Sequence, residues 1–103
     1  MIPYTTPLFQ IHIEGDGGNK LADCDHIWAN FRQGDLLLQK KEGVTFNADT
    51  GYAYVRLTQA ESGQFREGVM YIQLHAMQKD GNVWKSHVYP EQVERTLTEE
   101  AIT

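Results

Sequence analysis

The sequence is poor in cysteine and in long apolar runs, and each scarcity excludes a class of protein. Cys24 is the only cysteine among the 103 residues, so no internal disulfide can form. No apolar stretch approaches the ~20 residues that a membrane-spanning helix needs. The first six residues also lack the basic start and apolar run of a signal peptide. We therefore expect a soluble protein with no membrane partner, made in a reducing cytosol.

Basic residues are also scarce. Nine Lys and Arg stand against 14 Asp and Glu, which gives a formal net charge of −5. Phosphate backbones repel such a surface, so we predict no nucleic-acid partner. Lys40 and Lys41 form the only adjacent basic pair. At an exposed strand end, such a pair is typical of solvation and edge protection.

Short alternating runs separated by frequent turn signals make up most of the chain. Turns recur about every ten residues, which is the pattern of an antiparallel sandwich or barrel. Thr58 and Glu61 have the spacing of a capping box, which predicts one short helix at residues 59–64. We predict an all-β, two-sheet antiparallel sandwich in one domain over residues 1–97. Its seven strands lie near residues 8–14, 26–33, 36–41, 44–46, 52–57, 69–78 and 83–89.

One face of each longer run is apolar and is expected to form the core. The last predicted strand, at residues 83–89, is less clearly apolar. Trp84, Ser86 and Val88 share one face, and Pro90 is expected to end or kink the last strand. The residues predicted to point inward are Phe9, Ile11, Ile13, Ile27, Ala29, Phe31, Ala53, Val55, Leu57, Met70, Ile72, Leu74 and Ala76.

The residues after Pro90 allow two interpretations. Val93, Leu97 and Ala101 recur at a spacing of four, which is typical of a short amphipathic helix. An isolated helix of that length is marginal in water, so the alternative is a flexible tail over residues 98–103.

Two segments carry residue types that bind metals or phosphates, but neither has the required pattern. Asp23, Cys24, Asp25 and His26 are four possible metal ligands, yet on a strand alternate side chains point to opposite faces, so Cys24 shares a face only with His26. Two ligands do not close a zinc site. The glycine-rich segment 15–20 lacks the Gly-Lys-Ser/Thr of a phosphate loop and the spacing of a calcium loop, and reads as a turn. We predict no metal and no cofactor.

Catalytic machinery also has no support in the pattern. The four histidines, His12, His26, His75 and His87, are scattered over separate strands. No nucleophile elbow or local base accompanies them. We therefore predict no catalytic residues and a protein that is not an enzyme.

Aromatic residues on the faces opposite the core are the best interaction candidates. They are Trp28, Tyr52, Tyr54 and Tyr71, with Tyr89 as a further one. Exposed aromatics are enriched in interfaces because they bury a large area with few rotatable bonds. One interpretation is a contact face for a protein or a sugar. The other is that these rings pack beneath loops, or that the strand register differs.

Four segments in order carry a family resemblance: Thr-Thr-Pro-Leu-Phe at residues 5–9, Phe-Arg-Gln-Gly-Asp at 31–35, residues 55–61 with Phe65, and residues 69–74 leading to Lys-Asp-Gly at 79–81. In this order the chain resembles small proteins of phages and prophages of Gram-positive bacteria. It is also similar to the immunoglobulin-like N-terminal domain of siphophage baseplate upper proteins. The most particular motif is Leu-Thr-Gln-x-Glu at residues 57–61.

The resemblance implies an immunoglobulin-like sandwich that serves as a structural component of a virion tail or baseplate. Its partners would be other tail or baseplate proteins or further copies of itself, and it implies no catalytic residues. Such a protein would occupy the cytoplasm of the bacterial host during assembly and then the virion. The chain departs from the family pattern at the 15–20 insertion and at Pro90. Two other functions stay open: a carbohydrate-binding sandwich that uses the exposed aromatics, and a hydrolase or metal enzyme.

Overall fold

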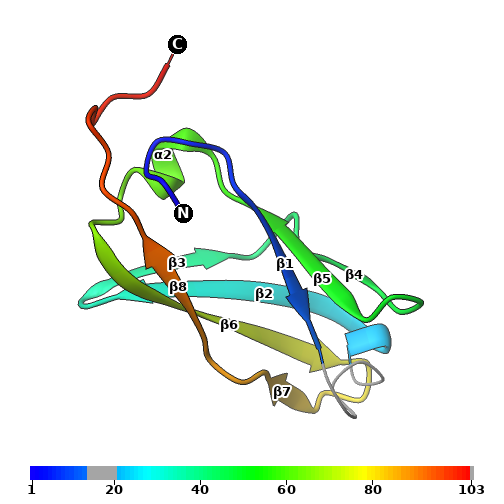
Figure 1. Cartoon of the computed structure of the whole chain (residues 1–103). Helices are drawn as coiled ribbons and strands as arrows, with labels where there is room; N and C mark the ends of the chain where they lie inside the picture. The colour runs from blue at the N-terminus through cyan, green and yellow to red at the C-terminus, as the bar shows by residue number, and fades with distance from the viewer. Residues whose placement is uncertain (14–20, 103) are drawn as a thin grey trace.

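Alternating apolar residues build two antiparallel sheets that pack face to face (Figure 1). The computed structural model describes residues 1–13 and 21–102. In the three-stranded sheet the order is β1-β5-β4, and in the five-stranded sheet it is β3-β2-β6, with β7 and β8 both pairing β6. The strands are β1 (Leu8–His12), β2 (Cys24–Gln33), β3 (Leu36–Lys40), β4 (Thr45–Asn47), β5 (Tyr52–Arg56), β6 (Gly68–Gln78), β7 (Val83–Lys85) and β8 (Tyr89–Val93). The predicted all-β, two-sheet sandwich is confirmed.

The core lies between the inner faces of the two sheets, as the alternation predicted. Phe31 on β2 is fully buried, and its ring lies 5.5 Å from that of Phe9 on β1 and 6.5 Å from that of Phe65. These rings therefore join the two sheets directly. The predicted inward residues are buried, apart from Phe9 and Ile27, which are half-buried. Leu21, Phe65 and Val93 are further core residues that strand alternation did not predict.

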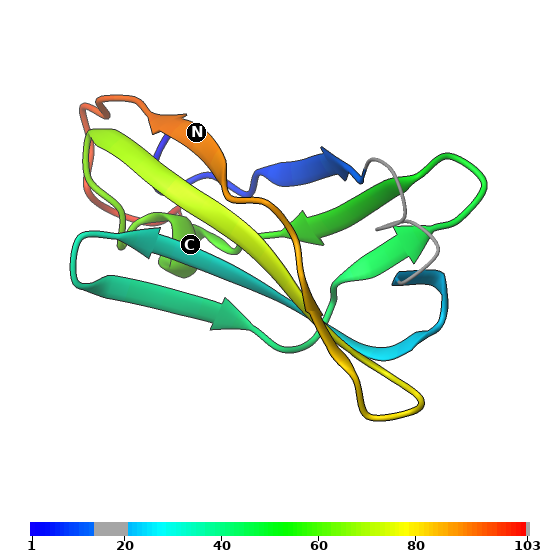
Figure 2. The ribbon, with the colours of Figure 1, turned by 90° about the horizontal axis from the view of Figure 1, so that it is seen from below.

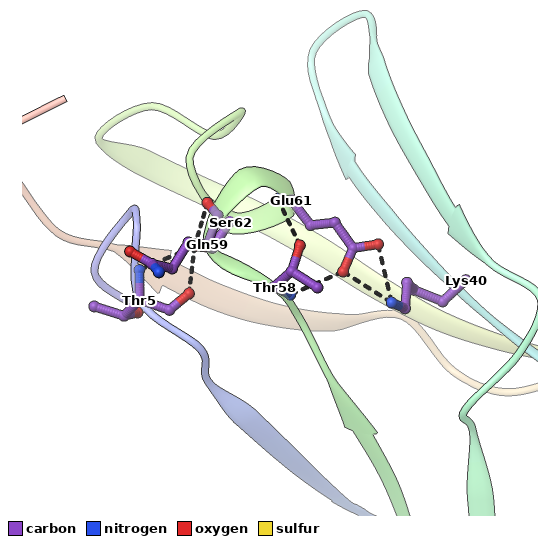
Figure 3. Close-up of polar contacts among 6 residues, drawn as sticks. All are labelled: Thr5, Lys40, Thr58, Gln59, Glu61 and Ser62. Atoms are coloured by element: carbon purple, nitrogen blue, oxygen red, sulfur yellow. Dashed lines mark hydrogen bonds and ion pairs between the residues drawn. The ribbon is translucent and has the colours of Figure 1, made fainter. Parts of the chain in front are cut away.

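A one-turn helix, α2 (Gln59–Ser62), connects β5 of one sheet to β6 of the other. The predicted capping box is present: the Glu61 amide donates to the Thr58 hydroxyl over 3.2 Å, and the Thr58 amide donates to the Glu61 carboxylate over 2.8 Å. Lys40 of β3 binds both oxygens of that carboxylate at 2.8 and 2.9 Å (Figure 3). The helix is thus tied to the edge of the five-stranded sheet.

The other side of α2 is held by the N-terminal segment. The buried hydroxyl of Ser62 donates to the Thr5 carbonyl over 2.7 Å and accepts the Thr5 amide over 3.1 Å (Figure 3).

Burial alone would favour the protonated form of Glu61. The hydrogen bonds from Lys40 and Thr58 and the charge of Lys40 outweigh it, so the pKa of Glu61 lies below its ordinary value.

The predicted strand at residues 83–89 is wrong, because it is two strands separated by a break. After β7, the buried Ser86 hydroxyl accepts the Leu74 amide over 2.9 Å and donates to the His87 carbonyl over 2.7 Å. A side chain thereby replaces part of the backbone ladder, and pairing resumes only at β8. Pro90 neither ends nor kinks this strand: it lies inside β8, opposite Tyr71. Proline is tolerated there because β8 is an edge strand, where one amide per pair of residues has no partner.

The chain after β8 forms no helix over residues 94–102, so of the two interpretations of this region the amphipathic helix is wrong. Val93 is fully buried as a strand residue, whereas Leu97 is 89% exposed. The segment leads past α2 (Figure 1), where the Gln59 side chain accepts the Ile102 amide over 2.8 Å and donates to the Ile102 carbonyl over 3.0 Å.

The turn predicted at residues 15–20 lies outside the described residues. No described helix is long and apolar enough to cross a membrane.

Candidate functional site

The structure divides the four candidate aromatics between two opposite faces of the sandwich. Trp28 on β2 and Tyr71 on β6 lie on the outer face of the five-stranded sheet, where they pair with His75 and Arg32 respectively. Tyr52 and Tyr54 on β5 lie on the outer face of the three-stranded sheet. Antiparallel partners share a face. The four residues therefore form two pairs and not one surface.

A row of amide side chains crosses the middle of the outer face of the five-stranded sheet. Gln39 on β3 donates to the Asn30 side chain over 3.0 Å, and Asn30 on β2 donates to the Gln73 carbonyl over 3.2 Å. Gln73 on β6 then donates to the Ser86 carbonyl over 2.9 Å. The row fixes these polar side chains across four segments that are neighbours in the sheet: β3, β2, β6 and the chain at Ser86. It presents a rigid polar strip between two apolar areas.

The first apolar area surrounds Trp28. Its ring makes an edge contact with His75, with 5.5 Å between the centroids. The Lys41 ammonium lies 4.7 Å from the Trp28 ring centroid. Beside the ring is an apolar pit of about 90 Å³, which is lined by His26, Trp28, His75, Ala76, Met77 and Val83. The pit matches one aliphatic side chain in size, while Lys41 covers part of the ring that a sugar would need.

The second apolar area surrounds Tyr71. This ring is 49% exposed, and Leu37 beside it is 43% exposed. A shallow groove of about 470 Å³ runs from here to His75 and Lys85. Val88 lines its far side because the break after Ser86 releases the chain from the β6 ladder. Figure 2 looks onto this outer face, with β3, β2, β6 and β8 side by side.

The charge on this face is opposite to that of the whole chain. Arg32, Lys41 and Lys85 lie on it or at its edge, together with His26 and His75. On the strands of this sheet, from His26 onward, no outward position holds Asp or Glu. None of the three cations forms an ion pair with a described carboxylate. In a chain of net charge −5, this face is a local cationic, apolar surface.

The outer face of the three-stranded sheet is more polar and its aromatics contact each other. The rings of Tyr52 and His12 lie 5.0 Å apart, and those of Tyr52 and Tyr54 lie 6.4 Å apart. Leu8 is the one other large apolar side chain exposed on the strands of this face. Tyr54 is half-buried. This aromatic pair is therefore a narrow ridge among mostly polar neighbours on the described strands.

The metal-ligand candidates near Cys24 are separated by strand geometry. A register shift falls between Cys24 and His26, so the regular alternation that would align them is interrupted. Burial, with the charges of Asp23, Asp25 and Asp80, raises the pKa of the Cys24 thiol. A raised pKa keeps a thiol protonated at neutral pH, which weakens it as a ligand or nucleophile. No group of three or more His, Cys, Asp or Glu converges as a metal site among the described residues.

Sequence reasoning missed several parts of the outer face. Leu37, Val83 and Val88 are exposed on it, and Lys41 reaches the Trp28 ring. The outward position of Leu37 was readable from its place opposite Arg32 in the hairpin. The outward position of Val88 was not readable from the sequence, because it depends on the break at Ser86.

Comparison with protein-family models, with curated proteins and with solved structures finds no match to this chain.

Proposed function

We propose that this protein is a non-enzymatic assembly module that binds other proteins through the outer face of the five-stranded sheet. One observation carries the proposal: exposed large apolar side chains gather on this face beside the fixed amide row. They are Leu37, Val69, Tyr71, Met77, Val83 and Val88. Exposed apolar areas beside fixed polar groups are typical of protein interfaces.

The setting we propose is the tail or baseplate of a phage or prophage of a Gram-positive bacterium. The support for this setting is the order of sequence segments described above, which resembles small phage proteins. Partners would be other tail or baseplate proteins or further copies of the chain. The protein would meet them in the host cytoplasm during assembly and stay with them in the virion.

Two double variants test the proposal, because each outer face has one exposed Leu and one exposed Tyr. Leu37→Ser with Tyr71→Ser alters the five-stranded sheet, and Leu8→Ser with Tyr52→Ser alters the three-stranded sheet to a similar degree. In phage particles purified from the encoding strain, we expect the wild type and the second variant to be present. The first variant should be depleted at least about tenfold, since two anchors are lost.

Absence of the wild type from such particles, together with a monomeric mass by light scattering over a hundredfold concentration range, would overturn the proposal. Equal loss of both double variants would also contradict it, because the two faces would then be equivalent. Circular dichroism of each variant must match the wild type before particles are compared.

Carbohydrate binding is the second candidate, and the exposed Tyr71 ring beside the Asn30 and Gln73 amides favours it. Aromatic rings stack on sugar faces while amides bond to hydroxyls. The position of Lys41 over Trp28 is against it. We expect a glycan screen at millimolar sugar to find no binder; binding that Tyr71→Ala abolishes would replace the assembly proposal.

A further inference from the structure

The chain carries its own candidate for what the outer face of the five-stranded sheet binds. Leu97 is 89% exposed and Ile102 is 86% exposed, the highest values among the large apolar side chains of the described residues. Glu99 and Glu100 lie between them, and residues 96–102 contain no basic residue. We call residues 96–102 the acidic tail. Two apolar side chains left in water, with carboxylates between them, match the composition of a binding segment and not of a packed one.

The acidic tail complements the outer face of the five-stranded sheet in charge. That face carries Arg32, Lys41 and Lys85, none of which is paired with a described carboxylate. Opposite charges on two surfaces steer their encounter and fix their relative register. The outer face and the acidic tail therefore carry opposite charges.

The spacing of apolar groups matches as well. In an extended chain, Leu97 and Ile102 lie five residues apart, which is about 17 Å. On the face, the Tyr71 area and the Met77 end of the pit lie six residues apart along β6, which is about 20 Å. Lys85 lies between them, opposite His75. Side chains five residues apart in a regular strand point to opposite sides, so the tail contacts both areas only if it bends between Leu97 and Ile102. Its backbone bends at Glu100 in this structure. Bent in this way, one tail can place an aliphatic side chain in each area and carboxylates near the cations between them.

The tail does not reach the outer face of its own domain in this structure. It leads past α2, on the side of the sandwich away from that face (Figures 1 and 2). Gln59 of α2 holds the Ile102 backbone through two hydrogen bonds. The tail of one molecule is thus presented outward, and its complement lies on a different side of the molecule.

From these observations we infer that the acidic tail of one copy docks on the outer face of the five-stranded sheet of a second copy. The inference rests on the proposed function and names its partner as this same chain. Tail and face are different surfaces, so the contact is heterologous and continues from copy to copy into an open chain or a ring. Leu97 and Ile102 are the apolar anchors, and Glu99 and Glu100 supply the salt-dependent part of the attraction.

Mixing two variants tests the head-to-tail arrangement. The tail variant carries Leu97→Ser with Ile102→Ser, and the face variant carries Leu37→Ser with Tyr71→Ser. Light scattering should show that the wild type assembles with concentration and that each variant alone stays monomeric over the same range. An equal mixture should form a dimer and stop there, because one intact tail and one intact face remain per pair. Glu99→Gln with Glu100→Gln should weaken assembly about tenfold at low salt and less at high salt.

Three outcomes would overturn the inference. If the tail variant assembles like the wild type while the face variant does not, the face binds something other than the tail, and the proposed function stands. If the wild type is monomeric at all concentrations, or the mixture stays monomeric while the wild type assembles, head-to-tail docking is wrong. The particle experiment then decides the proposed function separately, since it measures binding to any tail protein.

A peptide probe covers the case in which a variant misfolds. A synthetic peptide with the sequence of residues 94–102 is titrated into the tail variant or, if that fails to fold, into the isotope-labelled wild type. In NMR spectra, the backbone amide chemical shifts of Tyr71, Gln73 and Lys85 should change on titration, and those of Gln10 and Tyr54 should not. The same peptide with Ser in place of both apolar anchors should bind at least about tenfold more weakly. No shift on this face at millimolar peptide would contradict the inference.

Discussion

The two outer faces of this sandwich are built by the same strand alternation and differ in what they expose. The outer face of the five-stranded sheet combines two apolar areas, a fixed amide row and cations without a described carboxylate partner. The outer face of the three-stranded sheet has a ridge of Tyr52 and Tyr54 with His12 against it. Both faces read alike in sequence as outward aromatics. Only the neighbouring strands distinguish an extended surface from a ridge.

The comparison depends on the inner faces holding the two sheets together, and Phe31 tests that first. Phe31→Ala removes a fully buried ring that contacts Phe9 and Phe65, so we expect unfolding to become easier by about 3–5 kcal/mol. Denaturant unfolding followed by fluorescence measures this loss in the free energy of unfolding. Leu37→Ala on the neighbouring strand should cost far less, since Leu37 is 43% exposed. A cost for Phe31→Ala below about 1 kcal/mol would show that the core lies elsewhere.

Ser86 tests whether the break between β7 and β8 shapes the five-stranded sheet. Ser86→Ala leaves the Leu74 amide without its acceptor in a buried position, and we expect a loss of about 1–3 kcal/mol. Amide hydrogen exchange at Leu74 should also become faster. Thr50→Ala, in the exposed turn before β5, is the control and should change stability little. If Leu74 exchange is unchanged, the hydroxyl is not what maintains the break.

Glu61 tests the joint between the sheets through pH. Its folded pKa is lowered, so the ionised carboxylate stabilises the fold above its ordinary pKa, and this contribution is lost as pH falls through the folded value. Glu61→Gln should cost about 1–2 kcal/mol at neutral pH and little in acid. Thermal unfolding between neutral and acidic pH measures the difference. Lys40→Met should reduce the same pH dependence while the capping bonds remain, and an unchanged profile in both variants would contradict this account.

Lys41 gives the smallest expected effect and sharpens the description of the Trp28 area. Its ammonium lies 4.7 Å from the ring centroid, so Lys41→Met should cost about 0.5–1 kcal/mol at most. The fluorescence of Trp28, isolated in a Trp84→Phe background, should change when Lys41 is replaced. Lys79→Met in the exposed turn after β6 is the matched control and should leave the emission as it was. Identical spectra for both variants would place Lys41 away from the ring.

Much of the architecture followed from local patterns in the sequence. Period-two alternation gave the inward faces of β1, β2, β5 and β6, and the capping box gave α2, because these signals depend on neighbours within a few residues. The C-terminal region did not follow. Val93, Leu97 and Ala101 fit a helix by spacing, yet pairing with β6 made Val93 part of a strand. Tertiary pairing outweighs a weak helical preference in so short a segment.

The sequence by itself determined the fold class, most of the core and the identity of the outward aromatics, because side-chain alternation and turn chemistry are local. Only the tertiary structure decided that Trp28 and Tyr71 lie apart from Tyr52 and Tyr54, since sheet membership is set by pairing between distant strands. It also decided that Val88 lines the groove and that Lys41 lies over Trp28. A surface is made by residues that are distant along the chain, so its shape and charge emerge only after the chain has folded.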